Sequence, residues 1–324
     1  MKVVVTGAGG FIGRHLVTVL LARKQLVGRD GRPAPIRRLV LADVAAPTVR
    51  PVAGIDVETV AGDMRDPAFA AGLTDGADSI FHLAATLTTA TEANPRLGIE
   101  LNVLALVDLL ERCRIAGTAP KLVFVSSMAT FGGALPAAVG DDVFQTPQTS
   151  YGAHKVIAER LIDDYSRRGF LDGRSLRFPF VLIRRSGVGA VSDRIAQILR
   201  DPLAGHDVVA PVAPETRMAV VSVQRSAAAL VDLHDVPAAS FGPTRALNMP
   251  SLTVTAAEMI DAMKRAGEGR RLGAVTFTPD PEIQRIVDGW PAVFGSQRAE
   301  ALGLRPDDSF EAICRAYLDE VDAR

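Results

Sequence analysis

Short apolar runs alternate with amphipathic helical patterns along the first half of the chain. The runs are rich in Val, Ile and Leu and cover residues 3–5, 39–43, 57–60, 79–85 and 122–125. Such runs are typical of parallel strands that are buried on both faces, and the stretches between them repeat apolar residues with a helical period. The alternation predicts a doubly wound parallel α/β sheet with right-handed crossovers.

The pattern changes from Leu176, where the expected strands become shorter and prolines recur at Pro202, Pro211 and Pro214. We expect residues 1–175 to form a nucleotide-binding domain that also carries the catalytic residues. Residues 176–324 are expected to form mainly a smaller, substrate-binding lobe. Within this half the chain is expected to return to the sheet near residues 244–250 and to end in an amphipathic helix over residues 310–321.

Two segments of the first half interrupt these patterns. Between Arg23 and Arg38, glycines and prolines are dense enough to break a helix or a strand, which predicts a polar surface loop over residues 24–37. The alternative is that its basic residues reach an anionic ligand. Residues 86–89 are expected to begin a second loop, and a long helix is expected over residues 97–116.

Composition narrows the class of partner. The chain has 324 residues, of which 48% are hydrophobic and 23% are charged, and its net charge is −1. Near-neutrality argues against nucleic acid or an anionic membrane as the main partner. No apolar run approaches the ~20 residues of a membrane-spanning helix, and a strand that begins at residue 3 argues against a signal peptide. Cys113 and Cys314 form no metal or redox motif, so we expect no metal site and a reducing, cytoplasmic compartment.

Glycines cluster directly after the first apolar run, at Gly7, Gly9, Gly10 and Gly13, and an amphipathic helix follows them. Glycine adopts positive φ and lets another backbone approach closely, and the N–H groups at a helix start bind anions. Strand, glycine turn and helix together are typical of the pyrophosphate site in a Rossmann-type fold. The alternative is a tight strand-to-helix turn that binds no ligand.

Acids at the ends of the next two strands indicate which dinucleotide binds. Asp43 ends the second strand, where a carboxylate accepts hydrogen bonds from ribose hydroxyls and repels a 2′-phosphate, which favours NAD over NADP. A role as a helix N-cap or turn aspartate is the alternative. Asp63, after the third strand, can accept a hydrogen bond from the adenine amino group. The predicted NAD contacts are Gly7, Gly9, Gly10, Phe11, Ile12, Gly13, Asp43, Asp63, Met64, Leu83, Ala84, Ala85, Tyr151 and Lys155.

A tyrosine and a lysine supply candidate chemistry. Tyr151 and Lys155 lie four residues apart in a helical pattern and therefore share one helix face. A nearby ammonium group lowers the pKa of a phenol, about 10 when unperturbed, so that the phenol can take a proton from an alcohol. Ser127, at the end of the fifth strand, would hydrogen-bond the same alcohol oxygen. His82 also suggests catalysis, but a position inside a strand favours a buried structural role.

The sequence resembles the extended short-chain dehydrogenase/reductase family, which includes NAD-dependent epimerases and dehydratases. The matching residues are 6–13, Asp43, 62–63, 82–85, Asn102, 126–127, Tyr151 and Lys155. The resemblance implies that Ser127, Tyr151 and Lys155 form a catalytic triad, which Asn102 extends to a tetrad by anchoring the lysine through a water molecule. Ser126 is the alternative to Ser127. The resemblance also implies that Lys155 binds the nicotinamide ribose, and that helices carrying Asn102 and Tyr151 pair in a homodimer.

A narrower group of this family is similar to the chain over most of its length. The matching segments are 28–36, 147–152, 164–170, 202–205, 216–218, 246–250 and 289–291. This group oxidises the 2-hydroxyl of the four-carbon sugar acid D-erythronate with NAD. The resemblance implies that the chain oxidises a small sugar acid by hydride transfer to NAD, with Tyr151 as the base. Residues 185–190 depart from the pattern of the group, so the exact substrate stays open.

The expected substrate carries a carboxylate, which needs a cation. Arg217 is the first candidate because a planar guanidinium can hold a carboxylate with two hydrogen bonds; a salt bridge within the lobe is the alternative. Thr88 and Ser127 are the candidates for the substrate hydroxyls. Trp290 is expected in the core rather than at the ligand.

Two other functions are compatible with the same fold. A nucleotide-sugar epimerase would keep NAD tightly bound and reuse it, and a non-catalytic NAD sensor would need the glycine motif alone. Met128 and Ala129 follow Ser127, where a dehydratase would carry an acid pair. The intact set of Ser127, Tyr151 and Lys155 favours an enzyme over a sensor.

Overall fold

A seven-stranded parallel sheet organises the computed structural model, which describes residues 1–182 and 191–322. Its strand order is β12-β8-β7-β6-β1-β4-β5, and every neighbouring pair is parallel. The strands are β1 (Lys2–Thr6), β4 (Arg38–Asp43), β5 (Asp56–Ala61), β6 (Ser79–His82), β7 (Lys121–Ser127), β8 (Asp172–Phe178) and β12 (Ala246–Asn248). The chain moves outward from β1 to β5 and then returns to β6. The predicted doubly wound Rossmann-type sheet is therefore confirmed, with its switch point between β1 and β6.

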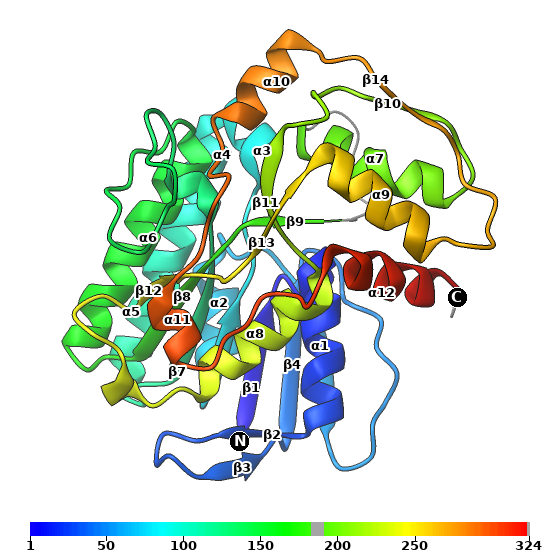
Figure 1. The fold of residues 1–324 in the computed structure, drawn as a ribbon. Helices are drawn as coiled ribbons and strands as arrows, with labels where there is room; N and C mark the ends of the chain where they lie inside the picture. The colour runs from blue at the N-terminus through cyan, green and yellow to red at the C-terminus, as the bar shows by residue number, and fades with distance from the viewer. Residues whose placement is uncertain (183–190, 323–324) are drawn as a thin grey trace.

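Helices cover both faces of this sheet, so the molecule has three layers here (Figure 1). Side chains alternate between the faces of a strand, and Val3 and Val5 point to one side while Val4 points to the other. The first side packs on α1 (Phe11–Arg23) and α8 (Val223–Asp235). The second side packs on α2 (Pro67–Thr74), α5 (Ala105–Ala116) and α6 (Ser150–Arg167).

The segment between β6 and β7 is more helical and less regular than predicted. The expected loop at residues 86–89 gives way to α3 (Thr88–Ala93). The expected helix over 97–116 is a run of α4 (Pro95–Ile99), a π-helical turn η1 (Glu100–Leu104) and α5. A π turn inserts one extra residue into a helix and replaces its i→i+4 hydrogen bonds with i→i+5 bonds, here from the Ala105 nitrogen to the Glu100 carbonyl, and the apolar pattern does not reveal it.

The loop predicted over residues 24–37 is wrong, because this segment forms a β-hairpin. Its strands are β2 (Gln25–Val27) and β3 (Pro33–Pro35), which pair antiparallel. Prolines are tolerated at an edge strand, and the apolar side chain of Leu26 is 1% exposed. The chain's amino terminus donates to the carbonyl of Pro35 over 2.9 Å. The hairpin therefore lies at the amino-terminal end of β1, opposite to the glycine motif, and its basic residues do not face that motif.

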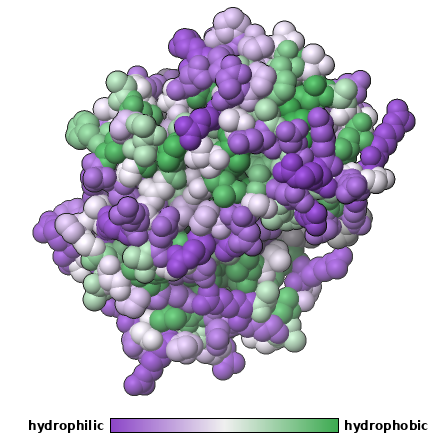
Figure 2. Space-filling model, viewed as in Figure 1, coloured by the Kyte–Doolittle hydropathy of each residue, from purple (hydrophilic) through white to green (hydrophobic). Residues whose placement is uncertain are grey.

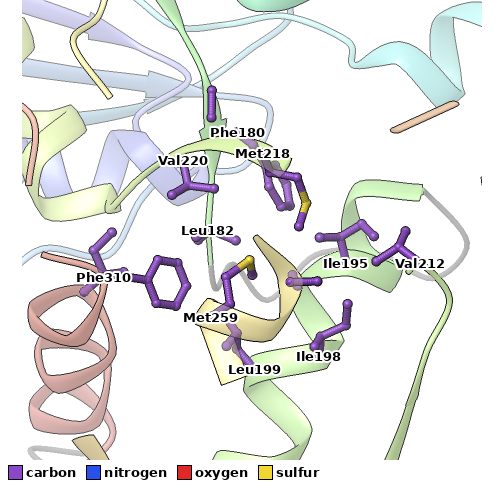
Figure 3. Packing of buried hydrophobic residues seen from close by; sticks show 14 of the residues in the cluster. Phe180, Leu182, Ile195, Ile198, Leu199, Val212, Met218, Val220, Met259 and Phe310 are labelled. Carbon is purple, nitrogen blue, oxygen red and sulfur yellow. The ribbon is translucent and has the colours of Figure 1, made fainter. Parts of the chain in front are cut away.

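The second half of the chain builds a separate apolar core. Its members come from helices and short strands that pack around Phe180, Met218 and Met259 (Figure 3). The remaining elements are η2 (Met128–Thr130), β9 (Phe180–Val181), α7 (Val191–Leu203), β10 (Val208–Ala210), β11 (Arg217–Val221), η3 (Ala238–Ser240), β13 (Leu252–Thr255), α9 (Ala256–Ala266), β14 (Val275–Phe277), α10 (Pro281–Asp288), α11 (Gln297–Ala301) and α12 (Phe310–Asp322). Strand β9 follows the carboxyl end of β8 after one residue, and β11 of the second core pairs with β9. This core is therefore attached to the carboxyl end of the main sheet.

The outer surface is mixed in polarity. On the face shown in Figure 2, apolar residues lie in several separate areas among polar ones. Within the part of the chain that the structure describes, no helix is long and apolar enough to cross a membrane.

Candidate active site

The glycine motif closes tightly over the switch point of the sheet. Gly7 follows β1 with a φ of 71°, which favours glycine. A Cβ at Gly7 would lie 2.8 Å from the backbone nitrogen of Ala84, and one at Gly13 would lie 2.2 Å from the carbonyl oxygen of Gly7. Both positions therefore require glycine for space. The start of α1 has no acidic residue in its first turn, so its N–H groups suit the pyrophosphate of a dinucleotide.

Asp43 lies against this motif. Its Oδ2 accepts a hydrogen bond from the Gly9 nitrogen at 2.9 Å, and its Oδ1 accepts one from the nitrogen of Val44 at 2.7 Å. Among the helices that the structure describes, none uses Asp43 as its N-cap. The carboxylate is half-buried at the end of β4, where a ribose would lie beside a pyrophosphate held by the glycines.

The other predicted cofactor contacts surround the same end of the sheet. Asp63 is paired with Arg65, whose guanidinium hydrogen bonds hold the pKa of this carboxyl below its usual range. Met64 is buried, and Leu83 and Ala84 leave β6 over the glycine turn, with the Leu83 nitrogen bonded to the carbonyl of Thr6 at 3.1 Å. This bond continues the pairing of β6 with β1 by one step, and β6 ends at His82 rather than at residue 85.

Tyr151 and Lys155 share one face of α6, as the spacing predicts. The Lys155 ammonium donates to the carbonyl of Val125 at 2.8 Å and lies 5.5 Å from the centroid of the Tyr151 ring. Both side chains are more than nine-tenths buried, at 3% and 9% exposure. Burial lowers the pKa of Lys155 to about 7, against the opposing effect of Glu159.

The two serines that end β7 point to different surroundings. Ser126 is 1% exposed, and its hydroxyl donates to the Glu159 carboxylate at 2.5 Å. Ser127 is half-buried, and its Oγ accepts a hydrogen bond from the Ala129 nitrogen at 3.1 Å. The Ser126 hydroxyl is thus committed to a buried acid. This arrangement favours Ser127 as the serine available to a substrate.

Asn102 lies in the π turn and fixes the backbone that leaves β6. Its side-chain oxygen accepts from the Thr86 nitrogen at 2.9 Å, and its side-chain nitrogen donates to the carbonyl of Thr86 at 3.1 Å. π turns often occur at functional sites. His82 is 2% exposed and bonded to the Thr6 hydroxyl, and burial lowers its pKa to about 3. His82 therefore stays neutral, in the structural role expected of it.

The predicted substrate residues lie on other elements. Thr88 begins α3, which packs against α6 through a hydrogen bond from the Ser150 nitrogen to Glu92 at 2.7 Å. Arg217 begins β11 and lines a pocket in the second lobe together with Thr216, Gln284, Asp288 and Trp290. The nearby Glu258 accepts from Thr255, in a capping box, rather than from Arg217.

Trp290 has two environments. It lines the pocket of Arg217 and also packs on Phe180 of the core, with 5.6 Å between ring centroids. Residues 185–190, where the sequence departs from its nearest group, lie outside the described residues.

The sequence did not indicate the network of polar side chains around a buried acid of α6. Glu159 of α6 is fully buried and pairs with Arg177 of β8. The signal that could have identified it is an acid on the apolar face of the helix, one turn after Lys155, because a buried carboxylate requires partners.

The chain is similar in sequence and structure to known enzymes. The model of the NAD dependent epimerase/dehydratase family matches residues 3–236. The chain is 41% identical over 326 residues to D-erythronate dehydrogenase from Cupriavidus necator, with 99% of each chain covered. It is 34% identical over 321 residues to D-erythronate dehydrogenase from Haemophilus influenzae, which covers 98% of this chain and 99% of that protein. The crystal structure of a nucleoside-diphosphate-sugar epimerase from Agrobacterium tumefaciens has 33% identity and a TM-score of 0.93, covering 100% of this chain and 95% of the other.

Proposed function

Because the chain belongs to the NAD-dependent epimerase/dehydratase family, we propose that it oxidises a secondary alcohol of a small sugar acid with NAD. The substrate is D-erythronate or a close analogue, oxidised at its 2-hydroxyl. The observation that carries the proposal is the buried pair of Tyr151 and Lys155 on α6, where Lys155 is bonded to the Val125 carbonyl of β7, two residues before Ser127. The two D-erythronate dehydrogenases that match nearly the whole chain support the choice of substrate.

The glycine motif and Asp43 would hold NAD, which supplies the acceptor for a hydride when it is bound. The N–H groups at the start of α1 bind the pyrophosphate, and Asp43 accepts from the adenosine ribose hydroxyls. Asp63 and Met64 contact the adenine, and residues 83–85 pack against the cofactor. The tight fit of Gly7 against Ala84 supports this assignment, because a side chain at Gly7 would push the glycine turn away from the backbone that leaves β6.

Tyr151 acts as the base in this proposal. The phenolate takes the proton of the substrate hydroxyl, and Ser127 donates a hydrogen bond that holds the same oxygen in place. Lys155 in its ammonium form stabilises the phenolate and binds the nicotinamide ribose. Asn102 positions the backbone around Thr86, and thereby the rim of the site.

The direct test measures NADH formation by purified protein with NAD and a panel of sugar acids. Tyr151→Phe should lower kcat about 10²–10⁴-fold, the usual worth of a general base, while the affinity for NAD is retained. Tyr165→Phe is the matched control, since Tyr165 lies on the same helix but bonds to Glu111. Wild-type activity in Tyr151→Phe would exclude this residue as the base.

Arg217 is proposed to bind the substrate carboxylate, with Thr88 and Ser127 at the hydroxyls. Arg217→Met should raise KM for the acid about 10- to 100-fold, since a hydrogen bond to a charged group is worth about 1.5–3 kcal/mol. Arg285→Met, an exposed arginine on α10, serves as the control. An unchanged KM in Arg217→Met would leave the pocket of Trp290 without a role in this reaction.

A nucleotide-sugar epimerase with tightly bound NAD is the second candidate, and the Agrobacterium protein similar over the full chain supports it. The two functions differ in their need for free NAD. Turnover of a nucleotide sugar without added NAD, together with no NADH from any sugar acid, would select the epimerase. A protein that binds NAD but does neither would be a sensor.

We also propose that the protein is a homodimer built on the helices beside the π turn. Large apolar side chains are exposed there at Ile99 (39%), Leu104 (48%) and Ile157 (43%). Light scattering should give twice the chain mass, and Leu104→Glu should reduce it to one chain because a buried charge at such an interface is costly.

A further inference from the structure

Glu159 is a buried carboxylate that the proposed reaction does not use. Its side chain is fully buried on α6, one helical turn after Lys155. It accepts from the Ser126 hydroxyl at 2.5 Å and from Gln145 at 2.9 Å. Arg177 of β8 donates to both of its oxygens, at 2.9 and 2.8 Å. A buried carboxylate is stable only when its charge and lone pairs are satisfied, and these partners do so.

The same face of α6 touches β7 and the short helix η2 that follows it at three successive levels. Gly152 packs on Ala129 so closely that a Cβ would lie 2.0 Å from its carbonyl oxygen. Lys155 donates to the carbonyl of Val125, and Glu159 accepts from Ser126. Residues three and four apart lie on one side of a helix. The separation of Tyr151 on α6 from the end of β7, where Ser127 lies, therefore depends on these contacts.

We propose that Glu159 is a positioning residue, which fixes α6, and with it Lys155, against β7 through Ser126. The Glu159 carboxylate also lies one helical turn from Lys155, and its negative charge favours the ammonium form of that side chain. This inference rests on the proposed dehydrogenase function. Arg177 supports the carboxylate and also donates to Asn248 of β12 at 3.1 Å, so the network extends to the edge strand of the sheet. The chain thus uses the far side of the catalytic helix to set the geometry and charge on its reactive side.

The electrostatics around Lys155 are consistent with this role. Tyr151, His154 and Glu159 face it from α6, and His82 faces it from β6. Burial lowers the pKa of Lys155, and Glu159 is the carboxylate that raises it. On the other side, Arg177 and Arg160 are the cations nearest to Glu159, at 2.8 and 3.9 Å. Removing the Glu159 charge therefore favours loss of the Lys155 proton.

The structure contains a matched pair for comparison. Asp172 and Arg174 form an ion pair on β8, and the Arg174 side chain is fully buried like that of Arg177. Arg174 donates to the carbonyls of Leu233, His234 and Val236, away from the catalytic helix. Asp172→Asn should therefore cost stability without altering Lys155.

The experiment compares Glu159→Gln with Asp172→Asn in the full-length protein. Both should unfold at lower urea concentration. Only Glu159→Gln should lower kcat, about 10- to 100-fold, with a change below about threefold in KM for NAD; these factors follow the cost of misplacing a catalytic group. The high-pH limb of its pH–rate profile should move to lower pH, because the Lys155 ammonium is lost earlier.

A second readout does not need activity. The chain has five lysines, so the Lys155 signal in a ¹³C-labelled lysine spectrum can be assigned with Lys155→Arg. The Lys155 titration midpoint should fall in Glu159→Gln and stay unchanged in Asp172→Asn. If the wild type forms no NADH from any acid, the proposed function fails while this titration still tests Glu159. An unchanged midpoint in Glu159→Gln would overturn the inference.

If Glu159→Gln does not fold, Ser126→Ala tests the contact between Glu159 and β7 in its place. It removes one hydroxyl and leaves the carboxylate paired with Arg177. We expect kcat to fall about 3- to 10-fold, in line with one lost hydrogen bond, with unchanged NAD binding and an unmoved Lys155 midpoint. Full activity in Ser126→Ala would show that the contact between Glu159 and β7 does not set the site.

Discussion

The room available for a Cβ atom, more than the spacing in the sequence, decides which positions of the glycine motif require glycine. A Cβ at Gly10 would approach only the Gly7 carbonyl oxygen, at 3.1 Å. A Cβ at Gly13 would overlap that same oxygen at 2.2 Å and reach Ala8 at 2.9 Å. The first contact is tight and can relax, whereas the second pushes the start of α1 away from β1. Gly13 therefore sets how closely the helix start approaches a bound pyrophosphate.

Gly13→Ala should weaken NAD binding at least tenfold and destabilise the fold by about 1–3 kcal/mol, the usual cost of overpacking. Gly72→Ala is the matched control, because Gly72 lies in α2 with open space around its Cβ position. That variant should be more stable by about 0.5–1 kcal/mol, the helix preference for Ala over Gly. Fluorescence titration with NAD and urea unfolding measure both quantities. Equal NAD affinity in Gly13→Ala and the wild type would contradict this account of the motif.

Among the elements, the β2–β3 hairpin shows how buried polar groups fix a segment of low intrinsic order. Asp235 at the end of α8 accepts from the Val27 nitrogen at 2.9 Å and pairs with Arg23. Lys121 at the start of β7 donates to the Val27 carbonyl at 3.0 Å. Both the backbone N–H and the backbone carbonyl of Val27 are thus hydrogen-bonded to side chains outside the hairpin. The hairpin closes the end of the sheet that faces away from the candidate active site.

Asp235→Ala should lower the free energy of unfolding by about 2–3 kcal/mol, because it leaves the part-buried Val27 N–H unpaired and Arg23 without its closer acid. Asp232→Ala is the control, since that carboxylate is 52% exposed and lies 3.6 Å from Arg23. Its effect should stay within about 0.5 kcal/mol. Urea unfolding gives both values. A loss of kcat in Asp235→Ala at temperatures where it is folded would contradict the separation of the hairpin from the site.

What the sequence predicts across the whole molecule depends on how local the signal is. The first five strands of the main sheet, the glycine motif and the Tyr151–Lys155 pair are encoded within a few residues, and the sequence predicts all of them. The Glu159 network joins Ser126, Gln145, Arg177 and Asn248 across five segments, so no local pattern marks it. The hairpin was missed because its prolines hide an edge strand, and its pairing with Asp235 spans more than two hundred residues. Long-range pairing thus decides what local propensity leaves open.

Two of the three histidines that are buried in the described part of the chain have strongly lowered pKa values, and they make the stability of the whole fold dependent on pH. His82 and His234 are 2% and 0% exposed, and burial lowers their pKa values to about 3 and about 4. The unfolded chain binds these protons near pH 6.5, whereas the native protein does not until its lowered pKa values are reached. The unfolded state therefore binds more protons as the pH falls through 6.5, and stability must decrease. Below pH 6.5 the decrease is about 1.4 kcal/mol per pH unit for each histidine. Between pH 7 and pH 5 only about 1.5 pH units lie in this range, so the pair loses about 4 kcal/mol.

Urea unfolding at pH 7, 6 and 5 measures this loss in a range where most carboxylates stay ionised. His82→Asn should remove about half of the pH dependence that the pair contributes, whatever it costs in stability at pH 7, because Asn does not titrate. His206→Asn should leave the dependence unchanged, since His206 is exposed. If His82→Asn lost stability with pH as steeply as the wild type, acid sensitivity would have to come from groups other than the strand histidine. His82 lies in β6 near Lys155 of the candidate active site. In that case, protonation of His82 would not be the step by which acid unfolds the protein.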